Sequence, residues 1–209
     1  MNVCMLAYTF YETDNRVRRY AETLARRGDN VDAIVLQQEG KASFEIVNGV
    51  NVYRIQKRVR DERSPFSYLG KLLLFFVRSM WAVTARHLKA RYDIIHVHSV
   101  PDFEVFATVI PRLMGAKVIL DVHDIVPELY ASKFKVNERS LAFRMLLLIE
   151  KLSSVFSHHV IIANHLWYKK LIERAVKPAK CTAIINYPDP SIFYRRPRTA
   201  SGTTDFVMC

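Results

Sequence analysis

Short apolar segments alternate with helical patterns along most of this chain. Six segments are nearly continuous in apolar residues, as is typical of strands that are buried on both faces: residues 2–8, 31–36, 92–98, 117–123, 159–164 and 181–185. Helical spacing predicts five helices between them: one that begins at Asp14 or Asn15 and ends at Gly28, then 66–90, 102–114, 138–157 and 165–175. An Asn48-Gly49 pair inside FEIVNGVNVYRI predicts a β-hairpin. The pattern predicts an α/β fold with a Rossmann-like, doubly wound parallel sheet.

The character of the chain changes after Asn186. The segment YPDPSIFYRRPRTASGTTD is rich in proline and small polar residues, as is typical of a linker, and DFVMC then resembles the start of a strand. We therefore expect one domain over 1–186, a linker over 187–204, and the start of a truncated second domain over 205–209.

Composition narrows the compartment and the partners. The three cysteines are far apart and odd in number, and the N-terminus lacks a basic leader, so we expect reduced thiols and a cytoplasmic protein. The net charge is +11, and between Arg54 and Arg91 ten basic residues accompany two acidic ones. Without a zinc spacing, basic-zipper or RNA-binding signature, nucleic acid is the weaker hypothesis. An anionic membrane surface or a phosphorylated small molecule fits this charge better.

The predicted helix 66–90 is unusually apolar and carries its basic residues on one stripe. No uncharged run reaches the length of a membrane span, so the helix is either packed deeply or lies in the plane of a membrane surface. In the second case the protein would be peripheral at the inner face of the plasma membrane. The expected membrane contacts are then Lys71, Phe75, Phe76, Arg78 and Trp81.

Polar clusters follow five of the predicted strands, at the edge where open parallel sheets bind ligands. They are YTFYETDNR, HVHSVPD, DVHDIVPE, ANH and NYPD. Together they predict a cleft at the carboxyl ends of the strands. The candidate catalytic residues in these clusters are His123 and Asp124, and the candidate binding residues are Thr9, Asn15, Arg16, His98, Glu128, Asn164 and Asn186.

The two strand-end histidines carry the strongest chemical signal. His98 and His123 could donate to sugar hydroxyls or phosphate or transfer a proton, although bonds to loop carbonyls would also explain them. Asp124 could orient His123 or bind hydroxyls. We place His96 on the opposite face of its strand from His98, in a structural role. An arginine such as Arg16 in the first turn of a helix opposes the helix dipole, which suggests an anionic ligand or an acidic neighbour.

Other candidates have structural explanations of similar weight. Glu128 follows Pro127 and could equally complement the dipole of a helix. Turn formation explains Asn164 and Asn186 about as well as ligand contact does. The adjacent pair His158–His159 has no ligand spacing with His165, so no metal site is predicted. The first loop lacks the glycines of a dinucleotide or phosphate-binding fingerprint.

The chain resembles the N-terminal half of a family 4 retaining glycosyltransferase with the GT-B fold. The similar segments span roughly residues 1–193 and include YDIIHVHSVPD, AKVILDVHDIVPELYASKF and INYPDPSIF. The stretches HD-x-x-PE and N-x-PD-x-x-IF, taken in this order, are the most specific features. The subgroup resembles enzymes that build bacterial surface polysaccharides on lipid carriers.

The resemblance implies that this domain receives the acceptor, and that a C-terminal domain holds the nucleotide-sugar donor, a co-substrate rather than a cofactor. It implies that His123 lies near the transferred sugar and that Thr9 to Arg16 form the first-strand loop. That loop has TDNR in place of the usual glycine pair, and the paired glutamates of a donor domain do not occur before Cys209. We therefore expect residues 1–209 alone to transfer no sugar. The alternative hypothesis is a non-catalytic basic α/β module that binds an anionic membrane or a protein partner.

Overall fold

The computed structural model describes residues 1–57, 65–99, 101–134, 137 and 139–186. Within it, an eight-stranded sheet has the order β3-β4-β2-β1-β5-β6-β7-β8. Its strands are β1 (Asn2–Phe10), β2 (Asn30–Gln37), β3 (Phe44–Val47), β4 (Val50–Lys57), β5 (Ile94–His98), β6 (Lys117–Val122), β7 (His159–Ile162) and β8 (Cys181–Ala183). All neighbouring strands are parallel except β3 and β4. The Rossmann-like prediction is confirmed, while the predicted linker and second-domain start lie outside the described residues.

The β3–β4 hairpin confirms the turn predicted from Asn48-Gly49. Both residues have positive φ, 50° and 82°, as a two-residue type I′ turn requires. The hairpin places β3 at an edge of the sheet, next to a sheet interior that is otherwise parallel.

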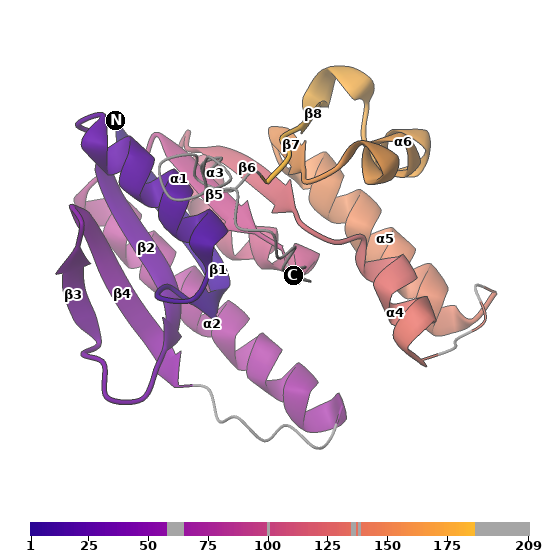
Figure 1. The fold of residues 1–209 in the computed structure, drawn as a ribbon, viewed down its shortest axis with the longest axis horizontal. Helices are drawn as coiled ribbons and strands as arrows, with labels where there is room; N and C mark the ends of the chain where they lie inside the picture. Colours follow the sequence, from indigo (N-terminus) through magenta and orange to yellow (C-terminus); the bar gives the residue numbers. More distant parts are fainter. Residues whose placement is uncertain (58–64, 100, 135–136, 138, 187–209) are drawn as a thin grey trace, which may run out of the picture.

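Helices cover both faces of the sheet (Figure 1). They are α1 (Asn15–Arg26), α2 (Pro65–Lys89), α3 (Val109–Leu113), α4 (Val126–Phe134), α5 (Leu141–Phe156) and α6 (His165–Arg174), with 3₁₀ helices η1 (Asp102–Thr108) and η2 (Pro178–Lys180). The sheet has a hydrophobic core on each face, and successive side chains of β1 point alternately into one and the other. Met5 lies in the same core as Val17 of α1, and Leu6 lies in the same core as Phe75 of α2.

Two helix predictions need correction. The segment predicted as one helix over 102–114 is a 3₁₀ helix followed by the five-residue α3. Pro111 explains the break, because it has no N–H for the carbonyl four residues earlier and its ring crowds that carbonyl. The helix predicted over 138–157 begins at Leu141, where Ser140 caps it by accepting a hydrogen bond from the Phe143 N–H. The five predicted helices also did not include α4, although a helix near Pro127 was considered for Glu128.

Helix α2 is a packed helix of the fold with one exposed apolar side. Leu72, Phe75 and Val83 are buried against the sheet. The prediction that Phe75 contacts a membrane is therefore wrong, since its side chain is fully enclosed. By length and composition Ser67–Lys89 is nevertheless apolar enough to cross a membrane, a test that core helices of soluble proteins also pass. Trp81, in contrast, is 77% exposed.

Candidate functional site

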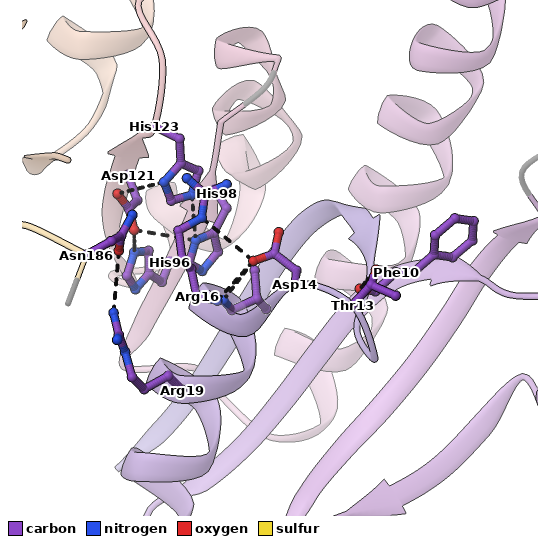
Figure 2. A network of polar contacts seen from close by, with 11 residues as sticks. Phe10, Thr13, Asp14, Arg16, Arg19, His96, His98, Asp121, His123 and Asn186 are labelled. Carbon is purple, nitrogen blue, oxygen red and sulfur yellow. Dashed lines mark hydrogen bonds and ion pairs between the residues drawn. The ribbon is translucent and has the colours of Figure 1, made fainter. Parts of the chain in front are cut away.

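A cluster of three histidines and one aspartate lies at the carboxyl ends of β5 and β6, near the centre of the sheet (Figure 2). His96 and His98 come from β5, Asp121 from β6, and His123 directly follows β6. All four side chains are buried. The prediction that His96 faces away from His98 is wrong: residues two apart on a strand share a face, and the two rings stack with centroids 4.3 Å apart.

Asp121 is the centre of this cluster. Its Oδ2 lies 3.2 Å from His96 Nε2 and 3.4 Å from His98 Nδ1, and its Oδ1 lies 3.8 Å from His123 Nδ1. His98 Nδ1 and His123 Nε2 are 3.4 Å apart. Burial raises the pKa of Asp121, but hydrogen bonds from His96 and His98 outweigh it, so the pKa is lowered and the carboxylate stays ionised.

His98 and His123 are neutral near pH 7. Burial, reinforced by neighbouring His96, lowers the pKa of His98 to about 4. Burial also lowers the pKa of His123, despite the opposing effect of Asp121. A neutral imidazole offers one N–H donor and one acceptor nitrogen. Among the described residues, His98 Nε2 and His123 Nδ1 have no hydrogen-bond partner, so both rings have capacity left for a ligand.

These two histidines line a cavity of about 220 Å³ between the ends of β1, β5 and β6. Thr9, Arg16 and Asp124, three of the residues proposed from the sequence, also line it. Its remaining lining residues are Ala7, Tyr8, Asp14 and Ser99. The volume is below the roughly 300–1,000 Å³ of a drug-sized pocket, so this cavity fits one unit of a larger substrate rather than the whole of it.

The positive charge of Arg16 is balanced by Asp14, the N-cap residue of its helix. Asp14 caps α1 by accepting hydrogen bonds from the Arg16 and Val17 N–H groups, at 3.1 and 3.3 Å. Its Oδ1 lies 3.8 Å from Arg16 Nε. The Arg16 side chain is 35% exposed and lines the cavity, so it remains able to contact an anionic ligand.

The other predicted contacts lie outside this cavity. Glu128 receives two hydrogen bonds from Arg174, at 2.6 and 2.8 Å, in the first turn of α4. Asn164 caps α6 by accepting from the Trp167 N–H at 2.8 Å. Asn186 accepts a hydrogen bond from Arg19 beside the histidine cluster.

Asn15, another predicted contact, also lies outside the cavity. It is the first residue of α1, and its side chain is exposed.

A larger hollow of about 580 Å³ lies at the opposite edge of the sheet, lined among others by Asp93, Lys117 and His159. Because ligands of open parallel sheets bind beyond the carboxyl ends of the strands, we assign the smaller cavity as the site.

Sequence reasoning missed Asp121 and His96 as members of the site, and also Asp14 and Ser99 as lining residues. The spacing His-x-His at the end of one strand and Asp-x-His at the end of the next could have found the first two. Residues at i and i+2 share a face, and β5 pairs with β6 in a register that places His98 opposite Asp121.

A mostly parallel sheet with its polar site at the carboxyl edge places this chain in the class of Rossmann-like ligand-binding domains. The sequence model described as "Glycosyl transferase 4-like domain" matches residues 13–186. The chain therefore belongs to the glycosyl transferase 4-like domain family, a family of sugar transferases. The search of curated proteins found no match.

Solved structures agree on the fold. Sucrose-phosphate synthase from Thermosynechococcus elongatus is similar with a TM-score of 0.67 and 18% identity, over 93% of this chain and 50% of that one. Anabaena Alr3699/HepE, in complex with UDP and glucose, gives a TM-score of 0.57 and 13% identity, over 94% and 47%. The lipopolysaccharide outer core galactosyltransferase WaaB gives 0.54 and 4%, over 89% and 46%. The chain thus spans about half the length of these structures.

Proposed function

We propose that this domain is the acceptor-binding half of a retaining glycosyltransferase that moves a sugar from a nucleotide-sugar donor to a glycan acceptor. The observation that carries the proposal is the pair of buried histidines, His98 and His123, with unpartnered ring nitrogens at the carboxyl edge of the sheet. Neutral imidazoles suit sugar hydroxyls, because each can donate one hydrogen bond and accept another. Anabaena Alr3699/HepE, which has the same fold, binds UDP and glucose.

In this proposal the residues of the cavity divide the work. His123 contacts the transferred sugar, while Asp124 binds hydroxyls at the mouth of the cavity. Arg16, which adjoins the cavity on α1, meets phosphate or an acidic group of the acceptor. The donor is held mainly by a second domain, so residues 1–209 alone transfer no sugar.

Side-chain NMR of the imidazoles tests whether this cavity binds sugar. In buffer with a metal chelator, high concentrations of monosaccharides and short glycans are added to residues 1–209. We expect the ring signals of His98 and His123 to shift, because both residues line the cavity and each has a ring nitrogen without a hydrogen-bond partner among the described residues. The signals of His159 and His165, which lie elsewhere on the molecule, should stay in place. Shifts confined to the latter pair, or none at any histidine, would contradict the proposal.

We further propose that the acceptor is lipid-linked, as in bacterial surface polysaccharide synthesis, and that α2 contacts the cytoplasmic face of the membrane. Four apolar residues of α2 recur every four positions and are 48–77% exposed: Leu69, Leu73, Val77 and Trp81. A row at this spacing lies along one side of a helix. The +11 charge of the chain would favour anionic lipid. Phe76 is half-buried, whereas Arg78 is exposed and donates to the Ile55 carbonyl.

Vesicle flotation tests this membrane contact. Burying an apolar side chain contributes about 1.5–3 kcal/mol, so Trp81→Ser with Leu73→Ser should weaken binding to anionic vesicles at least about tenfold. Leu166→Ser is the matched control, since Leu166 is as exposed as Trp81 but lies on α6. Binding should also fall as salt rises. Equal binding by the double variant and by wild type would contradict the proposal.

The imidazole shifts separate this proposal from the non-catalytic module, because both hypotheses predict vesicle binding. A module that binds membrane without sugar predicts flotation together with no imidazole shift on sugar addition.

A further inference from the structure

The contacts of the histidine cluster with Asp121 are long for hydrogen bonds. N–H···O hydrogen bonds in proteins are about 2.7–3.2 Å long. The two contacts that reach Asp121 lie at or beyond the upper end of this range, at 3.2 Å from His96 Nε2 and 3.4 Å from His98 Nδ1. Both nitrogens converge on the same oxygen, Oδ2, rather than sharing the two oxygens of the carboxylate.

The same separations match the edges of a metal-coordination tetrahedron. Zinc binds imidazole nitrogen and carboxylate oxygen at about 2.0–2.2 Å, and a tetrahedron with that radius has edges of about 3.3–3.6 Å. The separations of the Asp121 oxygen from the two nitrogens, 3.2 and 3.4 Å, lie at or close to this range. The donor atoms of His96, His98 and Asp121 all lie within 4.8 Å of one another, and all three residues are buried.

We propose that His96, His98 and Asp121 form a binding site for a divalent first-row metal ion of the zinc class. His-x-His on one strand places both rings on one face, and the register of β5 with β6 brings in the carboxylate. Two imidazoles and one carboxylate suit zinc better than magnesium, which prefers oxygen ligands. His123 Nε2 lies 3.4 Å from His98 Nδ1, next to these three residues.

The ion would also fix the proton on one histidine of the sugar cavity. With Nδ1 of His98 bound to the metal, the neutral ring keeps its proton on Nε2. That nitrogen is the one without a partner among the described residues, and His98 lines the cavity. His98 would then act as a hydrogen-bond donor to whatever occupies the cavity. The metal site goes beyond the proposed sugar transfer and does not depend on it.

Metal titration of residues 1–209, without any sugar, tests the inference. We expect Zn²⁺ to bind with one-to-one stoichiometry and to raise the unfolding midpoint, and Co²⁺ to give the visible absorption of a tetrahedral site. Mg²⁺ should do neither. Loss of a second-shell group typically weakens a metal about 10–100-fold, so loss of a ligand in His96→Asn should weaken Zn²⁺ by more than about 100-fold. His96 does not line the cavity, so this variant leaves the cavity's own histidines in place.

The double variant His159→Gln with His165→Gln is the control for adventitious binding by less buried histidines, and it should bind Zn²⁺ like wild type. Circular dichroism checks that His96→Asn folds, and Asp121→Asn provides a second ligand deletion. The absence of one-to-one Zn²⁺ binding by wild type would overturn the inference, whatever the variants do. Binding that survives in folded His96→Asn, or that disappears in the control, would overturn it as well. Because the sugar test is run with a chelator, either proposal can fail without the other.

Discussion

Replacing His123 by alanine is expected to lower kcat/KM for sugar transfer on the order of 100-fold in a polypeptide that also carries the donor-binding half. His123 is buried at the end of β6, lines the cavity and keeps a ring nitrogen without a partner among the described residues. The proposed contact with the transferred sugar would be lost with the ring, while the fold should persist. Release of nucleoside diphosphate from the donor, in the presence of acceptor, measures the effect.

His159→Ala is the matched control for this loss. His159 lies at the start of β7, at the opposite edge of the sheet, where its ring contacts the Thr182 hydroxyl at 2.9 Å. Transfer by this variant should equal that of wild type. Unchanged kcat/KM in a folded His123→Ala protein would remove His123 from the reaction.

Replacing Arg174 by methionine is expected to destabilise the domain by about 3 kcal/mol. Arg174 joins three helices: it donates to Glu128 of α4 at 2.6 and 2.8 Å and to Glu150 of α5 at 2.7 Å through two atoms. The Glu150 side chain is 2% exposed, so its carboxylate would be left buried without its cation. The estimate lies at the low end for a broken buried pair, because Arg174 itself is 26% exposed.

Urea unfolding of residues 1–209 measures this change. The control Lys170→Met removes a neighbouring cation that is 51% exposed and 3.7 Å from Glu128, and it should cost less than about 1 kcal/mol. Adding Glu150→Met to Arg174→Met should restore part of the lost stability, because the unpaired buried charge is then gone. If Arg174→Met unfolds at the same urea concentration as wild type, the network does not hold the three helices together.

Local signals predicted most of the fold. The strands are apolar runs bounded by turn residues, the Asn48-Gly49 pair has the positive φ of its turn, and Asp14 caps α1. The errors arose where a distant or less regular feature decides the conformation. Pro111 accounts for the division of one predicted helix into a 3₁₀ helix and the short α3, and the buried side of α2 depended on which face meets the sheet. Spacing along α2 therefore could not separate enclosed Phe75 from exposed Trp81.

The candidate site was only partly predictable for the same reason. His98 and His123 were found because histidines at strand ends fall on the ligand-binding edge of a parallel sheet. The coordination-like distances to Asp121 depend on strand register, which the sequence does not display. Glu128 had two plausible roles, and its partner Arg174 is 46 residues away, so spacing could not identify the pair. The cavity unites Thr9, Arg16 and Asp124 with the histidines, while Asn164 caps a helix elsewhere.

The most direct test of the account is sugar transfer measured on two polypeptides from the same reading frame. One is residues 1–209, and the other is the longest product of that frame; both receive a panel of nucleotide sugars with a lipid-linked acceptor. We predict transfer by a product that includes a donor-binding domain, with the configuration of the sugar retained, and none by residues 1–209. Turnover by residues 1–209 alone, or inversion at the sugar, would contradict the account.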